Sequence, residues 1–270
     1  NMVLTREEIS TVMGQQAVAD PIRVFVGLDT ASEVEDRVDI VMDELVRSKA
    51  FERKVLCFAS PTGSGYINYV LAEALEYMTL GDSAIATMQY SLLPSPMSLT
   101  RTGLAVEQNR DLMHAITGYL RGMDPDARPR LVLFGESLGA LTMQDIWKHR
   151  TVEAIDRDFV HSSIFLGTPS ATEFAKSWRL NPSKVDPDGK LIEVDDFGQL
   201  LALPADHRDR VRHVLISHYD DPIPKFGTNL LLRKPWWLGP PDQRPPGIPK
   251  STTWRPGTTF VLTGVDMVNA

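Results

Sequence analysis

The sequence predicts an α/β fold, in which a mostly parallel sheet carries helices on both faces. Short apolar runs rich in β-branched and aromatic residues alternate along the chain with segments of helical periodicity. These helical segments are long enough to serve as the crossovers that parallel strands require. The chain has 270 residues, enough to bury a sizeable core, and no internal repeat divides it. We therefore expect a single α/β domain over residues 1–270.

Composition excludes several classes of protein. Hydrophobic residues make up 43% of the chain and charged residues 23%, as in ordinary globular domains, and the net charge is −7. This negative balance argues against a nucleic-acid binder. No apolar run approaches the roughly 18 to 20 residues that span a bilayer, so we expect the chain as given to be soluble. The single cysteine, Cys57, excludes an internal disulfide.

The first half of the chain supplies three strands and four helices. Ser32 and Glu35 have the spacing of a capping box, and they precede an apolar face made of Val34, Val38, Val41 and Leu45. The expected elements are a helix over 6–18, a strand over 23–28, a helix from 33, a strand over 54–59, a helix over 66–78, a strand over 84–90 and a helix over 104–123.

The stretch over residues 130–147 carries the strongest chemical signal. An apolar strand ends in Gly135-Glu136-Ser137-Leu138-Gly139, and a helical pattern begins at once. So sharp a turn requires small residues on both sides, which the two glycines supply, and it exposes the hydroxyl of Ser137. The motif alone is weak, but a strand before it and a helix after it strengthen it. We expect Ser137 to be a nucleophile, the alternative being a simple helix cap.

The second half continues the alternation less regularly. A strand over 162–166 is followed by residues 169–210, a segment that contains at least one helix and is long enough to form a cap over the site. A strand over 211–217 then leads to Asp220 and Asp221.

The last segment, residues 225–270, differs in composition from the rest. Seven prolines and three of the five tryptophans lie between Pro235 and Pro256, and the segment carries a net charge of +4. Proline at this density predicts an extended loop without regular secondary structure. Trp236, Trp237 and Leu238 beside basic residues fit either a membrane surface or a flap packed over the mouth of the site.

A nucleophilic serine needs a base, a group that orients the base, and donors for the oxyanion. In an open parallel sheet these groups meet beyond the carboxyl ends of the strands. We expect Asp221 to be the acid, with Asp220 as the alternative, although both could simply close an Asx turn before Pro222. The expected oxyanion donors are the backbone N–H of Leu138 and one from the 60–65 loop, either Thr62 or Gly63.

The base is harder to assign. The six histidines are His114, His149, His161, His207, His213 and His218, and none follows Asp221. His218 lies at the correct edge of the predicted sheet, so it is the candidate within this sequence. A metal site made of His218, Asp220 and Asp221 is conceivable, but no second ligand cluster supports it. We predict neither a metal nor a cofactor.

Five short blocks together resemble a known family: residues 60–66, 135–139, 165–169, 220–227 and 263–267. They are similar to a family of bacterial α/β-hydrolase domains that follow a membrane-spanning region. The resemblance implies an α/β-hydrolase fold, Ser137 as nucleophile and Asp220 or Asp221 as acid. It also implies a histidine C-terminal to Val265-Asp266-Met267, and the sequence ends before such a residue. We therefore expect a domain without its C-terminal end, from a membrane-anchored parent protein.

Together these observations predict a serine hydrolase that acts on a small-molecule or lipid-like acyl ester through an acyl-enzyme. Two alternatives remain open. One is an acyltransferase that uses the same nucleophile, and the other is a hydrolase fold that binds ligands or partners without turnover.

Overall fold

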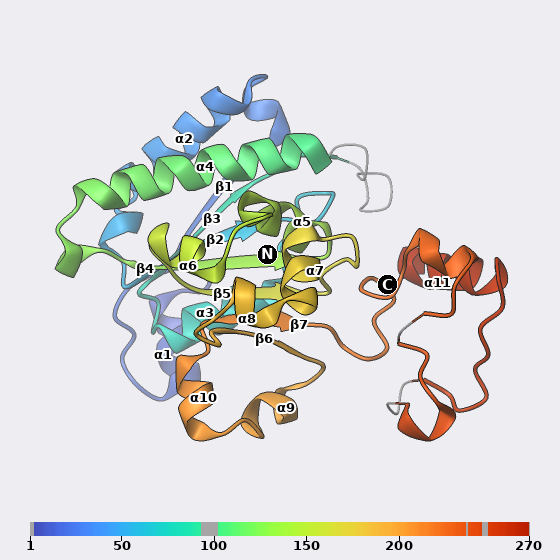
Figure 1. The fold of residues 1–270 in the computed structure, drawn as a ribbon. Helices are drawn as coiled ribbons and strands as arrows, with labels where there is room; N and C mark the ends of the chain where they lie inside the picture. Colours follow the sequence, from blue (N-terminus) through green and yellow to red (C-terminus); the bar gives the residue numbers. More distant parts are fainter. Residues whose placement is uncertain (1–2, 93–101, 236, 245–247, 270) are drawn as a thin grey trace.

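The centre of the molecule is a seven-stranded sheet. The computed structural model describes residues 3–92, 102–235, 237–244 and 248–269. The strands are β1 (Ile22–Val26), β2 (Val55–Ser60), β3 (Ser83–Met88), β4 (Arg130–Glu136), β5 (Val160–Leu166), β6 (Leu191–Val194) and β7 (His213–Ile216). Their order is β1-β3-β2-β4-β5-β7-β6, and each neighbouring pair is parallel. The expected parallel sheet is confirmed, and all its strands end on the same side (Figure 1).

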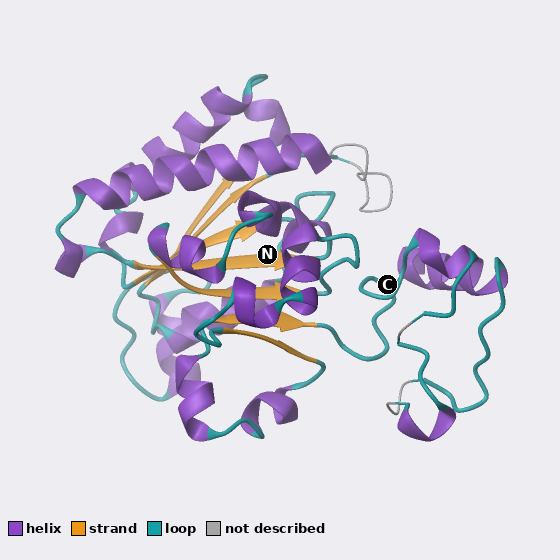
Figure 2. Ribbon diagram, in the orientation of Figure 1, coloured by secondary structure: helices purple, strands orange, loops and turns teal. Residues whose placement is uncertain are grey.

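Helices cover both faces of this sheet (Figure 2). The α-helices are α1 (Arg6–Met13), α2 (Val34–Arg47), α3 (Tyr69–Met78), α4 (Thr102–Gly122), α5 (Leu138–Gln144), α6 (Val152–Arg157), α7 (Glu173–Leu180), α8 (Pro182–Val185), α9 (Phe197–Leu201), α10 (Ala205–Arg210) and α11 (Thr258–Asn269). One hydrophobic cluster packs α2, α4 and α5 on one face of the sheet, and a second packs α3 on the other.

The apolar face of α2 confirms the sequence prediction, but its cap does not. Val34, Val38, Val41 and Leu45 are all buried. The expected Ser32–Glu35 capping box is wrong, because Glu33 precedes the helix and no side chain caps it. Instead, Arg37 is only 2% exposed and its Nη1 donates to the carbonyls of Ala31 and Ser32 at 2.9 and 3.2 Å. A buried guanidinium thus closes this turn.

Two other predicted helices are shorter than expected. The first, α1, ends at Met13 rather than at residue 18, since Gly14 takes a left-handed conformation with φ 64° and stops the helix. Its N-terminus carries a true capping box, made by Thr5 and Glu8. The third, α3, begins at Tyr69 rather than at residue 66, because the side chain of Asn68 accepts from the N–H of Val70 and caps the helix there.

Residues 169–210 are more than a cap. They contain α7, α8, α9 and α10, but also β6, which joins the edge of the sheet beside β7. The N–H of Leu191, at the start of β6, donates to the buried carboxylate of Asp186 at 2.7 Å. Part of the segment expected to cover the site therefore extends the sheet instead.

The C-terminal segment lies beyond the carboxyl ends of the strands (Figure 1). The expectation of a loop without regular structure is wrong here, because it includes the short 3₁₀ helices η6 (Thr228–Leu231) and η7 (Pro241–Gln243) as well as α11. The ring of Phe260 in α11 lies 5.0 Å from that of Phe226, and Trp254 Nε1 donates to the carbonyl of Leu230 at 3.0 Å. Residues after 256 contain no proline, which is why a helix can form there.

The described part of the tryptophan-rich stretch points inward. Leu238 is 1% exposed, and Trp237 Nε1 donates to the carbonyl of Lys225 at 3.2 Å. Trp236 lies outside the described residues. The hydrogen bond of Trp237 thus holds this stretch against the beginning of the same segment. Of the helices in the described ranges, none combines the length and the apolar character needed to cross a bilayer.

Cys57 lies in the middle of β2 and is fully buried. It belongs to the cluster that packs against α3. Burial raises the pKa of its thiol to about 12.

Candidate active site

Ser137 occupies the turn between β4 and α5. Its φ of 54° and ψ of −118° place a non-glycine residue in a strained backbone conformation, of the kind that persists where surrounding structure enforces it. The N–H of Ser137 donates to the carbonyl of Leu166 at 2.9 Å, and its carbonyl accepts from Leu141 at 3.1 Å. The turn is therefore held from β5 and from its own helix.

The two glycines of the motif are required by close packing. A Cβ on Gly139 would lie 2.3 Å from the carbonyl oxygen of Ser60, and a Cβ on Gly135 would lie 2.7 Å from backbone atoms of Gly139. The first turn of α5 thus lies directly against the end of β2. The sequence-based reason for these glycines is confirmed by this geometry.

Ser137 is partly exposed, and its side chain makes no capping hydrogen bond to α5. Leu138 is the first residue of α5. The first N–H groups of a helix have no intrahelical acceptor and carry partial positive charge, so the N–H of Leu138 suits an oxyanion. The hydroxyl and the amide donor belong to adjacent residues, as in the sharp strand-to-helix turn of a nucleophile elbow.

The loop after β2 was expected to supply a second donor. The N–H of Thr62 donates to the carbonyl of Tyr66 at 3.0 Å, so this N–H is committed within the loop. Gly63 lies in the same loop and is buried. Gln89 Nε2 donates to the carbonyl of Ser64 at 2.8 Å and fixes the loop from β3.

A buried polar cluster supports this loop from beneath. Asn109 of α4 donates through Nδ2 to the hydroxyls of Ser60 and Thr142 at 2.9 and 3.1 Å, and these two hydroxyls lie 3.2 Å apart. All three side chains are buried. The cluster ties α4, the end of β2 and α5 together directly below the turn. A polar residue on the inner face of a long helix is the only sequence signal for it.

Asp221 follows β7, which is separated from β4 by β5 alone. Its Oδ1 accepts from the N–H of Ile223 at 2.8 Å, so the Asx turn considered from the sequence does form. Its Oδ2 lies 2.7 Å from the point that a Cβ on Gly167 would occupy, which explains a glycine with φ 55° after β5. One carboxylate oxygen is therefore used in the turn, and the other faces the end of β5.

Glu136, next to Ser137, is a residue the sequence analysis did not single out. Its carboxylate accepts weakly from Asn68 Nδ2 at 3.4 to 3.5 Å. Burial raises its pKa, and the negative charge of Asp221 raises it further. Burial also raises the pKa of Asp221. Glu136 ends β4 and Asp221 follows β7, so both carboxylates lie at the carboxyl side of the sheet.

His218 pairs with Asp220 rather than with Asp221. Its Nδ1 is hydrogen-bonded to Asp220 Oδ1, and this bond lowers the pKa of Asp220. Both side chains are exposed, at 47% and 62%, and the imidazole packs against the ring of Tyr219. Within the described ranges, no histidine hydrogen-bonds to Asp221. The structure thus joins the alternative acid and the candidate base to each other, on the surface.

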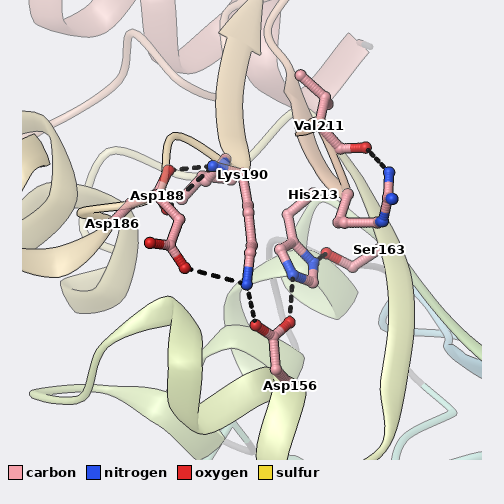
Figure 3. A network of polar contacts seen from close by, with 9 residues as sticks. Asp156, Ser163, Asp186, Asp188, Lys190, Val211 and His213 are labelled. Carbon is pink, nitrogen blue, oxygen red and sulfur yellow. Dashed lines mark hydrogen bonds and ion pairs between the residues drawn. The ribbon is translucent and has the colours of Figure 1, made fainter. Parts of the chain in front are cut away.

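His213 is held elsewhere, in the network shown in Figure 3. It opens β7 and is 1% exposed, with Nδ1 2.9 Å from the hydroxyl of Ser163 and Nε2 3.7 Å from Asp156 Oδ1. Lys190 Nζ contacts the other oxygen of Asp156 at 2.7 Å. His213 is the first residue of β7, so it lies at the amino ends of the strands, whereas Ser137 lies at their carboxyl ends. His213 therefore cannot reach the hydroxyl of Ser137.

A cavity of about 460 Å³ lies beside β6. It is lined by residues of α7, α8, β6, α9 and α10, including Trp178, Glu193 and His207, and not by Ser137 or Asp221. Within the described ranges, no cluster of three or more histidine, cysteine or acidic residues could hold a metal ion.

Comparison with known proteins shows the family to which the chain belongs. A profile described as the alpha/beta-hydrolase family matches residues 22–270. Among curated proteins, none matches the sequence significantly. Two solved structures are similar: an acetylxylan esterase (TM-score 0.39, 14% identity, 63% of this chain and 84% of that one) and a Trichoderma reesei cutinase in complex with a phosphonate inhibitor (TM-score 0.37, 12% identity, 73% and 82%). At these TM-scores we draw nothing further from either structure.

Proposed function

The chain belongs to the alpha/beta-hydrolase family, and from this premise we propose that it is a serine ester hydrolase whose nucleophile is Ser137. The observation that carries the proposal is the strained turn. A serine held at φ 54° between a strand and a helix, partly exposed and beside a free helix N-terminus, has the geometry of a nucleophile rather than of a cap. Its side chain accepts no hydrogen bond from the helix, as a cap would.

The proposed reaction divides ester hydrolysis into two steps. The oxygen of Ser137 attacks the acyl carbonyl while a histidine accepts the hydroxyl proton, and the N–H of Leu138 stabilises the oxyanion. Collapse of the tetrahedral species releases the alcohol, which takes up that proton, and leaves the acyl group on Ser137. Water then repeats the sequence and releases the carboxylic acid. We assign Asp221 as the group that orients the histidine through Oδ2.

One observation favours a second candidate, a ligand-binding module without turnover. In the described residues His218 is bonded to Asp220, and no histidine reaches Asp221. A base is needed for rapid acylation, so this arrangement suits a protein that binds an ester without cleaving it. Reactivity of Ser137 separates the two candidates.

A fluorophosphonate probe provides the test. We expect it to label the wild-type protein at Ser137 and not to label Ser137→Ala. Ser183→Ala serves as the control, because Ser183 is exposed and lines the separate cavity beside β6. Peptide mapping should place the adduct on the 130–147 stretch. An unlabelled but folded wild-type protein would support the binding module instead.

His218 is tested in the same assay. If it is the base, His218→Ala should lower the rate of labelling by at least about 100-fold, the lower range for general base catalysis. If His218 only pairs with Asp220, the substitution should leave the rate unchanged. In that case Asp220→Asn should also leave the labelling rate unchanged, whereas Asp221→Asn should lower it.

A further inference from the structure

The side chain of Lys225 folds back onto the loop that carries the acid. Its Nζ donates to the backbone carbonyls of His218 and Asp221 at 3.2 and 3.0 Å, and to that of Tyr219. An ammonium group has three donors, so all of them are used on three carbonyls of one turn. A neutral amine could not donate three times, and the geometry therefore requires the charged form.

The backbone of Lys225 is itself fixed from two sides. Its carbonyl accepts from Trp237 Nε1 at 3.2 Å, and the next carbonyl, that of Phe226, accepts from the hydroxyl of Ser170 at 2.5 Å. Ser170 belongs to the loop after β5, and Trp237 belongs to the C-terminal segment. Lys225 thus connects a firmly held stretch of backbone to the more exposed residues 218–221.

We propose that Lys225 is a positioning residue for the catalytic acid: it closes residues 218–221 into a fixed ring and so sets the direction of the Asp221 carboxylate. The inference rests on the proposed function of Ser137 and Asp221. Because the ammonium binds carbonyls and not the carboxylate, Asp221 Oδ2 is left to accept from the base. An ion pair between the two side chains would instead occupy that oxygen.

The charge of Lys225 has a second effect at this site. Asp221 is surrounded by charges of both signs, since Asp220 and Glu136 are negative, and His218 and Lys225 are positive when protonated. Burial raises the pKa of Asp221, and the positive charge of Lys225 opposes this rise. Burial also lowers the pKa of Lys225 itself, while Asp221, Asp220 and Asp195 act to keep it protonated. Loss of this cation raises the pKa of every neighbouring acid or imidazolium.

The test compares Lys225→Met, Lys225→Arg and wild type by the rate of fluorophosphonate labelling of Ser137 between pH 5 and 9. We expect Lys225→Met to slow labelling at least roughly tenfold, as displaced catalytic groups do, and to move the acidic limb of the profile to higher pH. Lys225→Arg should be slow, because a guanidinium cannot reproduce the compact three-way contact, yet it should keep the limb in place. Lys184→Met is the matched control, since Lys184 is exposed on α8.

A purely structural role would lower the rate equally at all pH values, so an unmoved limb in Lys225→Met overturns the proposal. Wild-type rates in both variants overturn it as well, while labelling of Ser137 in the wild type leaves the proposed function standing. Unlabelled wild type removes the proposed function and this inference with it. If Lys225→Met does not fold, as circular dichroism would show, Lys225→Arg alone decides, and a wild-type rate in that variant counts against the inference.

Discussion

At the scale of single residues, the turn at Ser137 requires glycine on both sides, because a side chain there would clash with backbone atoms. Gly139 approaches the carbonyl of Ser60 so closely that a methyl group cannot fit without moving α5 or β2. We predict that Gly139→Ala lowers the free energy of unfolding by about 1–3 kcal/mol, the usual cost of overpacking. It should also abolish labelling of Ser137. Urea denaturation and the fluorophosphonate assay measure the two effects.

Gly118 offers a matched control for that change. It lies within α4, and a Cβ there would meet nothing within 4 Å. Gly118→Ala should therefore stabilise the protein by about 1 kcal/mol, through helix propensity alone, and leave labelling intact. Equal destabilisation by both substitutions would contradict the close-packing account of the turn.

Residue-scale prediction from the sequence succeeded where local geometry dictates the residue type. Gly135 and Gly139 follow from the sharp turn at Ser137. By contrast, the pairing of His218 with Asp220 depends on how a short loop folds back, and spacing along the chain does not determine that. The contacts of Lys225 could not be predicted for the same reason, because its ammonium group reaches carbonyls four to seven residues earlier in that folded loop.

At the scale of elements, the network around Asp156 joins α6 to β5, to β7 and to Lys190, the residue before β6, as Figure 3 shows. The pKa of Asp156 is lowered to about 2, chiefly by His213 and then by Lys190. The 3.7 Å separation from His213 Nε2 is too long for a hydrogen bond, so that attraction is electrostatic, whereas Lys190 at 2.7 Å makes a true bond.

Because the pKa is lowered in the folded state, Asp156 stabilises the protein above about pH 4, and this contribution is lost as the pH falls from 4 towards 2. The carboxylate is partly exposed, so we discount the shift and predict that Asp156→Asn costs about 1 kcal/mol at pH 7. Urea denaturation at pH 7 and pH 3 should show a smaller difference from wild type at the lower pH. Asp188→Asn, which removes the more exposed partner of Lys190, should have little effect at either pH.

Elements with strong periodicity were predictable, and those made by tertiary contacts were not. The face of α2 follows directly from Val34, Val38, Val41 and Leu45. The strand β6 has only four residues. It is held by pairing with β7 and by the hydrogen bond from Leu191 to the carboxylate of Asp186, and periodicity reveals neither contact. The helix α11 was missed because the proline density before Pro256 was extended to the end of the chain.

At the scale of the whole molecule, an aromatic contact folds the C-terminal segment back on its own beginning. Phe260 of α11 packs on Phe226, near the start of the segment. We predict that Phe260→Ala loosens the segment and speeds tryptic cleavage after Lys250 several-fold, because local opening exposes that bond. Val261→Ala is the control, since Val261 is 58% exposed on the same helix. Equal cleavage of both variants would show that the aromatic contact does not hold the segment.

The lone thiol in β2 gives the protein a built-in reporter of its own stability. Cys57 has no exposed surface and ionises only near pH 12, so a thiol reagent at pH 8 can modify it only after the central sheet separates. With reagent in excess and reclosing fast, the rate of modification then measures the population of molecules that have opened globally. Destabilising substitutions should accelerate modification by the factor by which they raise the equilibrium constant for unfolding, whether or not they contact Ser137.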